Sequence, residues 1–95
     1  MSTKLEISQK IHRRLARKSF DKSWTLKYGS KEHFHSVVNG YYHNAVIKFQ
    51  ENHGSVAPLE VRKKIYKREL RDYVLDVKDH ISITGENRYL PKKYR

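Results

Sequence analysis

The sequence predicts a mainly all-α protein of three helices, in which the second and third helices form a long antiparallel hairpin. Apolar residues recur at three- and four-residue spacing along most of the chain, as they do on one face of a helix. Capping residues divide this pattern into three segments, and no low-complexity linker interrupts it. A chain of 95 residues suits one small domain. We therefore expect a single basic helical domain over residues 1–85 and a flexible basic tail over residues 86–95.

The first helix is expected to begin after Thr3. Thr3 and Glu6 have the spacing of a capping box, in which the side chain of each residue accepts the backbone amide hydrogen of the other. Ile7, Ile11 and Leu15 then recur every four residues. They form a narrow apolar stripe, which predicts a helix to about residue 19 that lies with this stripe on the core.

The second helix is expected to follow a break in the helical period. Residues 24–28 alternate apolar and polar side chains, and with residues 81–84 they could form a minor two-stranded β element. Ser30 is the expected N-cap, and apolar residues then follow the helical period for four turns over residues 34–49. Gly40 interrupts this helix at a cost of about 1 kcal/mol relative to alanine. It could allow a partner backbone to approach closely.

The third helix is expected between Pro58 and about residue 80, after Gly54 ends the second. Its main apolar face includes Leu59, Leu70 and Val77. A second apolar side carries three further residues, namely Val61, Ile65 and Leu75. This side predicts an interface with a protein partner, with a second copy of the chain, or with the first helix lying across it.

Several functional classes are excluded or disfavoured by what the sequence lacks. It has no cysteine, hence no disulfide, thiolate metal site or cysteine nucleophile. No apolar run has the length of a signal-peptide core or a membrane span, which predicts an intracellular protein of the cytoplasm, nucleoid or nucleus without a membrane partner. No glycine-rich phosphate loop or nucleophile elbow is present, so no cofactor is expected. The long hairpin also disfavours a helix-turn-helix.

The histidines suggest little chemistry by themselves. His33 and His35 are two residues apart and point to different sides of a helix, so no metal site is expected. His12 and His43 belong to different helices and could act as a general acid and a general base on RNA. A metal-free ribonuclease is therefore a minor alternative to the expectation that the protein is not an enzyme.

The strongest functional signal is the positive charge. The formal net charge is +11, from 21 Lys and Arg against 10 Asp and Glu. Residues 1–28 carry eight cations and two carboxylates, residues 29–57 carry two of each, and residues 58–95 carry eleven and six. The charge therefore lies in the two end regions, where a polyanion would relieve its self-repulsion.

These cations form three clusters that are expected to contact nucleic acid. One cluster lies on the first helix: Lys10, Arg13, Arg14, Arg17 and Lys18. A second repeats the same helical spacing on the third helix: Lys64, Lys67, Arg68 and Arg71. The tail adds Arg88, Lys92 and Lys93, interleaved with tyrosines that could stack on bases. Carboxylates flank the second cluster and could neutralise it, whereas no carboxylate lies between Glu6 and Asp21.

The sequence thus predicts a small accessory or regulatory protein that binds the phosphate backbone of RNA or DNA with little sequence specificity. The alternative is a protein-interaction module, for instance a small regulator or inhibitor that docks on an acidic surface of a partner such as a nucleic-acid enzyme. In that case Val61, Ile65 and Leu75 would dominate binding. Direct binding to nucleic acid would depend instead on Arg13, Arg14 and Arg17.

Overall fold

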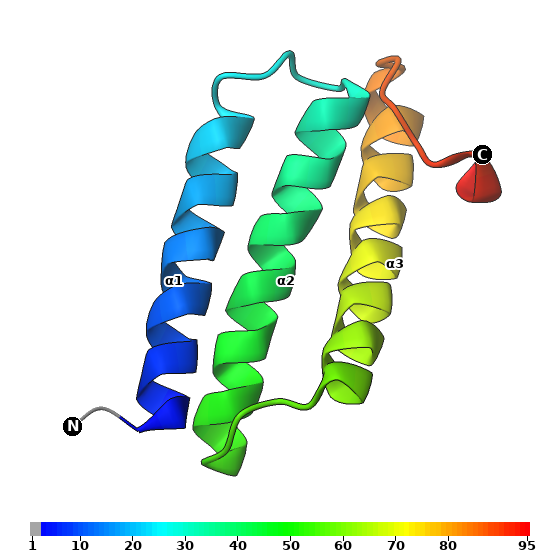
Figure 1. The fold of residues 1–95 in the computed structure, drawn as a ribbon. Coiled ribbons are helices and arrows are strands. Elements are labelled where there is room, and N and C mark those ends of the chain that lie inside the picture. The colour runs from blue at the N-terminus through cyan, green and yellow to red at the C-terminus, as the bar shows by residue number, and fades with distance from the viewer. Residues whose placement is uncertain (1–2) are drawn as a thin grey trace.

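A computed structural model describes residues 3–95 and contains three long helices. These are α1 (Lys4–Ser23), α2 (Lys31–His53) and α3 (Leu59–Thr84), followed by a short 3-10 helix, η1 (Lys92–Tyr94). α2 lies between α1 and α3 and runs antiparallel to both (Figure 1). The predicted all-α fold, with α2 and α3 as a long hairpin, is confirmed.

The minor β element was wrong. Residues 3–95 contain no strand. Residues 81–84 form the last turn of α3, and the amide of Gly85 still donates to the carbonyl of Ile81 at 2.8 Å. Residues 24–28 form turns, because the amides of Thr25 and Leu26 donate back to the carbonyls of Lys22 and Ser23. Local hydrogen bonds of this kind leave no row of free backbone groups for pairing.

The helix ends follow the capping signals of the sequence. Thr3 Oγ1 accepts the amide hydrogen of Glu6 at 3.1 Å, and Ser30 Oγ accepts that of His33 at 3.2 Å. Gly54 ends α2 with φ 66°, in the left-handed region where glycine has no steric penalty. These caps confirm where α1 and α2 begin and where α2 ends.

The apolar core lies between α2 and α3 in two clusters. One contains Phe34, Val38, Tyr73, Val74 and Val77, and the other contains Val46, Ala57 and Ile65. Ile65 is only 5% exposed, and Val61 packs against the same cluster, so assigning these two residues to a partner interface was wrong. Ala57 and the second half of α2 cover the side of α3 on which they lie. Of the three predicted interface residues, only Leu75 is exposed, at 54%.

The interface between α1 and α2 consists mainly of small and polar side chains. The buried residues of α1 are Gln9, His12, Ala16 and Ser23. Gln50 of α2 is fully buried; its Nε2 donates to Gln9 Oε1 at 2.7 Å, and its Oε1 accepts the amide hydrogen of Ala57 at 3.0 Å. Each buried polar group named here has a partner, which removes the penalty of burying it.

Two of the three residues in the predicted core stripe of α1 therefore face away from the core, while Leu15 is half-buried. Ile7 is 49% exposed and Ile11 is 41% exposed. α1 presents its opposite side to α2 because small side chains allow close approach there, most of all at Gly40. A Cβ atom added to Gly40 would lie 2.6 Å from the Phe20 ring. The neighbour that approaches Gly40 is thus an aromatic ring of α1, not the backbone of a partner.

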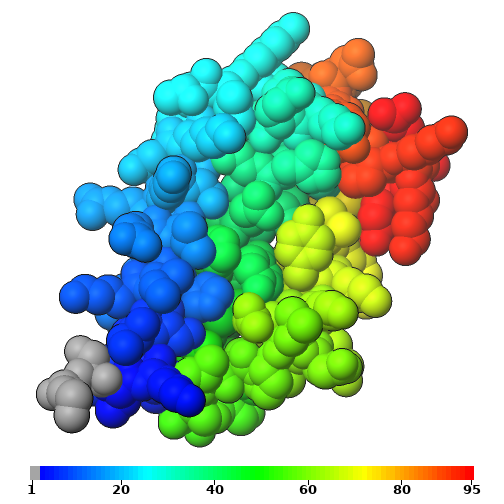
Figure 2. Space-filling view, viewed as in Figure 1, coloured from blue at the N-terminus to red at the C-terminus, as the bar shows by residue number. Residues whose placement is uncertain are grey.

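The C-terminal segment is packed against the helices, in contrast to the flexible tail expected for residues 86–95. The amide of Tyr89 donates to the carbonyl of Gly29 at 2.7 Å, and Tyr89, Leu90 and Tyr94 pack on the core cluster around Phe34. Figure 2 shows this segment, in red, lying against the end of the molecule that holds the last turns of α3. Its aromatic and aliphatic side chains supply the packing that a purely basic tail would lack.

Candidate nucleic-acid interface

The cationic cluster of α1 is solvent-exposed. All five members, which we call the α1 patch, are exposed: Lys10, Arg13, Arg14, Arg17 and Lys18. Of these five residues, only Arg13 has an ion-pair partner within residues 3–95, namely Glu51 at 3.7 Å. An exposed pair at this distance neutralises little charge. The α1 patch therefore remains strongly positive.

The cationic cluster of α3 is also exposed, and carboxylates lie beside it. We call Lys64, Lys67, Arg68 and Arg71 the α3 patch. Arg68 lies 3.4 Å from Glu69 and Arg71 lies 3.9 Å from Asp72, each pair joining neighbours in the sequence. Both arginines are exposed, so each pair neutralises little charge by itself, as in the α1 patch, but α3 has two such pairs and the α1 patch has one.

The cations of the C-terminal segment differ in exposure. Lys92 and Lys93 are exposed, whereas Arg88 is held within the fold. Its Nη2 donates to the hydroxyl oxygen of Tyr73 at 3.1 Å, and its guanidinium lies 4.7 Å from the centroid of the Tyr28 ring. Arg88 therefore anchors the C-terminal segment as well as contributing charge.

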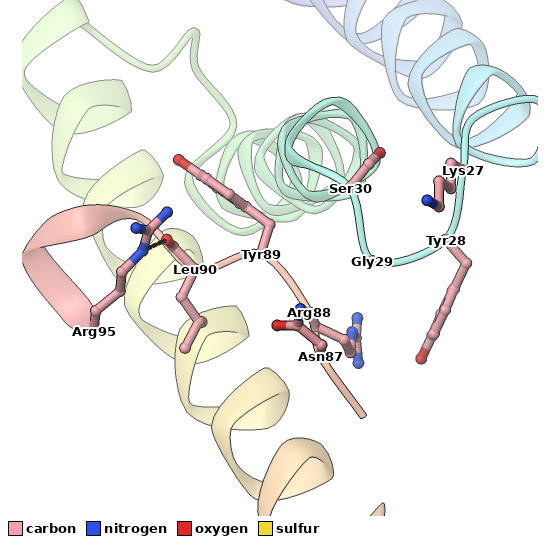
Figure 3. Close-up of a pocket in the computed structure, with 9 residues that line it drawn as sticks. All are labelled: Lys27, Tyr28, Gly29, Ser30, Asn87, Arg88, Tyr89, Leu90 and Arg95. Carbon is pink, nitrogen blue, oxygen red and sulfur yellow. Dashed lines mark hydrogen bonds between the residues drawn. The ribbon is translucent and has the colours of Figure 1, made fainter. Parts of the chain in front are cut away.

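Arg88 also lines a pocket where the C-terminal segment meets the loop between α1 and α2 (Figure 3). The pocket has a volume of about 640 Å³, and its cationic side chains are Lys27, Arg88 and Arg95. Two of these cations already have internal partners. Arg88 donates to the hydroxyl oxygen of Tyr73, and Arg95 Nε donates to the carbonyl of Leu90 at 2.9 Å. This pocket is positive, but its guanidinium groups are largely committed to holding the segment in place.

A different positive surface is formed by two grooves that flank the middle of α2. The α1–α2 groove has a volume of about 710 Å³ and the α2–α3 groove about 460 Å³. Asn39 and His43 line both grooves, so the grooves adjoin. Together they are lined by six cations, namely Lys18, Lys22, Lys31, Arg62, Lys63 and Lys67. Glu32 is the one carboxylate side chain that lines either groove.

The grooved face connects with residues that the sequence identified and adds others that it missed. Lys18 and Lys67 belong to the predicted clusters. Lys22, Lys31 and Arg62 could not be grouped from the sequence, because they are far apart in the chain and only the packing of the helices brings them to one face.

The structure also brings together His12 and His43, which the sequence left apart. Their Nδ1 atoms lie 2.9 Å from each other, so one ring donates a hydrogen bond and the other accepts it. Burial, together with the neighbouring His12, lowers the pKa of His43 to about 4. Burial and then the charge of Arg62 also lower the pKa of His12. Both rings are therefore neutral at pH 7.

This geometry does not favour the pair as an acid and base acting on RNA. A general acid and a general base must contact the reacting group from two sides. The direct hydrogen bond leaves no room for a phosphate between the two Nδ1 atoms, and His12 is only 8% exposed. The pair instead joins α1 to α2.

No protein-family model, curated protein or solved structure matches this chain. None of the helices described within residues 3–95 combines the length and the apolar character needed to cross a membrane. In the same residues, no three His, Cys, Asp or Glu side chains are grouped so that they could hold a metal ion.

Proposed function

We propose that this protein binds nucleic acid through the phosphate backbone, with little sequence specificity. The observation that carries the proposal is the exposed positive surface, which extends from the α1 patch through Lys18 into the grooved face around α2. Backbone amides, lysines and arginines that contact phosphates hold a protein on a strand without reading its bases. The positive side chains outnumber the carboxylates on this surface, so the surface favours a polyanion.

The strength of binding should depend steeply on salt. Each phosphate that a lysine or arginine neutralises releases condensed counterions, so the logarithm of the affinity falls as the logarithm of the salt concentration rises. If about six phosphates are neutralised, the slope is about −5 on duplex DNA. RNA and DNA both present the phosphates that this mechanism requires.

Fluorescence anisotropy of labelled single-stranded RNA, duplex RNA and duplex DNA tests the proposal at about 50 and about 200 mM salt. A variant with Arg13, Arg14 and Arg17 replaced by alanine should bind more weakly, and its salt slope should be smaller by up to about 3. The matched control removes three exposed cations outside the α1 patch and the grooves, by replacing Lys4, Lys48 and Lys78 with alanine. Failure of every ligand to bind at the lower salt concentration would rule out the proposal.

A second candidate is supported by the exposed stripe of α1. Ile7 and Ile11 lie uncovered beside Lys10 and Arg14, which suits a protein partner with an apolar surface surrounded by carboxylates. This surface replaces the one predicted on α3, where Ile65 is in the core and Val61 packs against it. A regulator or inhibitor of this kind would lose its partner when Ile7 and Ile11 are replaced by serine, and it would keep that partner in the arginine variant if apolar contacts dominate.

A further inference from the structure

The α2–α3 groove combines aromatic, apolar and cationic side chains. The pocket beside Arg88 has the same kinds of side chain, but two of its three cations already donate hydrogen bonds within the fold. Tyr42 and Tyr66 supply rings, and Leu59 supplies an apolar wall. Arg62, Lys63 and Lys67 line the same groove, and no carboxylate side chain does. Its volume of about 460 Å³ falls within the range of sites that bind small molecules.

We infer that this groove holds one unpaired nucleotide of a bound strand, with the base against Tyr66 and Leu59 and the phosphate among the three cations. The inference rests on the proposed function and names the form of nucleic acid that this part of the surface takes.

The cations are available for a phosphate. No ion pair within residues 3–95 involves Arg62, Lys63 or Lys67. The Nε atom of Arg62 is buried and has no hydrogen-bond partner in the structure, so the fold does not use this guanidinium in the way it uses Arg88. An unneutralised guanidinium in the same groove as two lysines suits a phosphate group, which guanidinium binds with two parallel hydrogen bonds.

One ring is available for a base. Tyr42 and Tyr66 meet edge to face, with their centroids 5.7 Å apart and their planes at 74°. Tyr42 is also contacted by the rings of His43 and His12, at centroid distances of 4.8 and 6.4 Å, whereas Tyr66 has no other aromatic contact within residues 3–95. Leu59 is 55% exposed although it is a large apolar side chain, so the wall beside the rings is also uncovered. Base–aromatic stacking tolerates any base, in keeping with weak sequence specificity.

Only an unpaired base can use these groups. In a duplex the faces of each base are stacked on its neighbours, whereas a single strand can turn a base outward onto an aromatic ring. The groove therefore predicts tighter binding of single strands than of duplexes that carry the same sequence.

The test compares three variants for binding to a labelled single strand of about ten nucleotides and to its duplex, a length within the range of single-strand sites. Tyr66→Leu should weaken single-strand binding about tenfold and leave duplex binding unchanged. Leu59→Ser should weaken single-strand binding by a smaller factor. Leu75→Ser is the matched control, because Leu75 is 54% exposed on α3 but lines neither groove, and it should change neither affinity.

Photocrosslinking provides a second measurement that does not depend on how the variants fold. A strand that contains 5-iodouracil is irradiated with the unchanged protein, and the modified residue is identified by mass spectrometry. Crosslinks at Tyr42 or Tyr66 are expected. Crosslinks confined to other aromatic residues, such as Trp24 or Tyr94, would overturn the inference while leaving the proposed function intact.

The remaining outcomes distinguish nucleotide binding in the groove from phosphate-backbone binding by the protein as a whole. Equal affinity of the unchanged protein and both groove variants for the single strand overturns the inference alone. If neither strand form binds at all, the proposed function fails, and the inference fails with it. If nucleoside monophosphates shift the NMR signals of the Tyr66 ring but strands do not bind, the groove is a site for free nucleotides, and the inference is again overturned.

Discussion

Replacement of Gly40 by alanine tests the packing of α1 on α2, because helix propensity and tertiary packing predict opposite signs. In an exposed helix, glycine to alanine stabilises by about 1 kcal/mol. Here the added Cβ would lie 2.6 Å from Cε1 and Cζ of Phe20 and 2.8 Å from Cε2. Carbon atoms prefer separations of about 3.5 to 4.0 Å, so the ring or the whole of α1 must move by about 1 Å.

Movement of the ring disturbs its contact with Tyr41, whose ring centroid lies 5.4 Å away. Overpacking costs about 1 to 3 kcal/mol, and a contact with three ring atoms belongs to the upper part of that range. After subtraction of the gain in helix propensity, Gly40→Ala should lower the free energy of unfolding by about 2 kcal/mol. The melting temperature should fall by roughly 10 °C.

Urea and thermal unfolding followed by circular dichroism measure this change. The control is the same substitution in a Phe20→Ala background, where the ring is absent and Gly40→Ala should stabilise by up to about 1 kcal/mol. If Gly40→Ala stabilises the otherwise unchanged protein, the Phe20 ring does not lie on Gly40, and the described packing of α1 is refuted.

Three further predictions concern polar contacts, two of which join helices and one of which anchors the C-terminal segment. The folded-state pKa of His43, about 4, lies below the ordinary value of 6.5. As pH falls, the unfolded chain therefore binds a proton at His43 before the folded protein does. The free energy of unfolding should decrease as pH falls from about 6.5 to about 4. Allowing for solvent screening of this partly buried ring, the loss of stability is about 1 to 2 kcal/mol. Urea unfolding at several pH values measures this loss, which should be smaller in a His43→Asn variant. Gln50→Leu leaves Gln9 and the Ala57 amide without their partner, so it should lower the free energy of unfolding by about 1 to 3 kcal/mol, and an unchanged urea midpoint would contradict the buried network. Arg88→Ala should release the C-terminal segment, and limited proteolysis should then show faster cleavage after Lys92 and Lys93. Equal cleavage rates in the variant and the unchanged protein would contradict the anchoring role of Arg88.

The number and order of the helices and most of their limits could be predicted from sequence because they depend on local signals. The end of α1 was not, since α1 continues to Ser23, about one turn past the predicted end near residue 19. Thr3, Ser30 and Gly54 act on backbone groups within a few residues of themselves, and the sequence contains all the information that such caps require. The last turn of α3 was missed because the alternation over residues 81–84 resembles a strand, although the helix simply continues to Gly85.

The orientation of α1 could not be predicted from sequence. Hydrophobicity favours burial of Ile7 and Ile11, yet the side with Gln9, His12 and Ala16 is buried. That choice depends on partners that lie more than 30 positions away in the sequence, such as Gln50 for Gln9 and His43 for His12. A polar side chain is buried at low cost only when such a partner is present, and the sequence pattern does not contain that information.

The candidate interface, too, could be predicted only where its residues lie on a single helix. The α1 patch could be predicted because its cations repeat along one helix. The grooved face could not, because Lys22, Lys31 and Arg62 come from three different helices. Arg88 was assigned to the ligand by its position in a basic segment, whereas its contacts with Tyr73 and Tyr28 were not visible in the sequence.

The most direct test of the central proposal is the affinity of the protein for a labelled single strand, measured across a range of salt concentrations. Neutralisation of about six phosphates predicts a linear fall in the logarithm of the affinity with a slope of about −4 on a single strand. The slope should be smaller when Arg13, Arg14 and Arg17 are replaced by alanine. The absence of binding at the lowest salt concentration, or an affinity that does not change with salt, would contradict the proposal that this surface binds phosphate backbones.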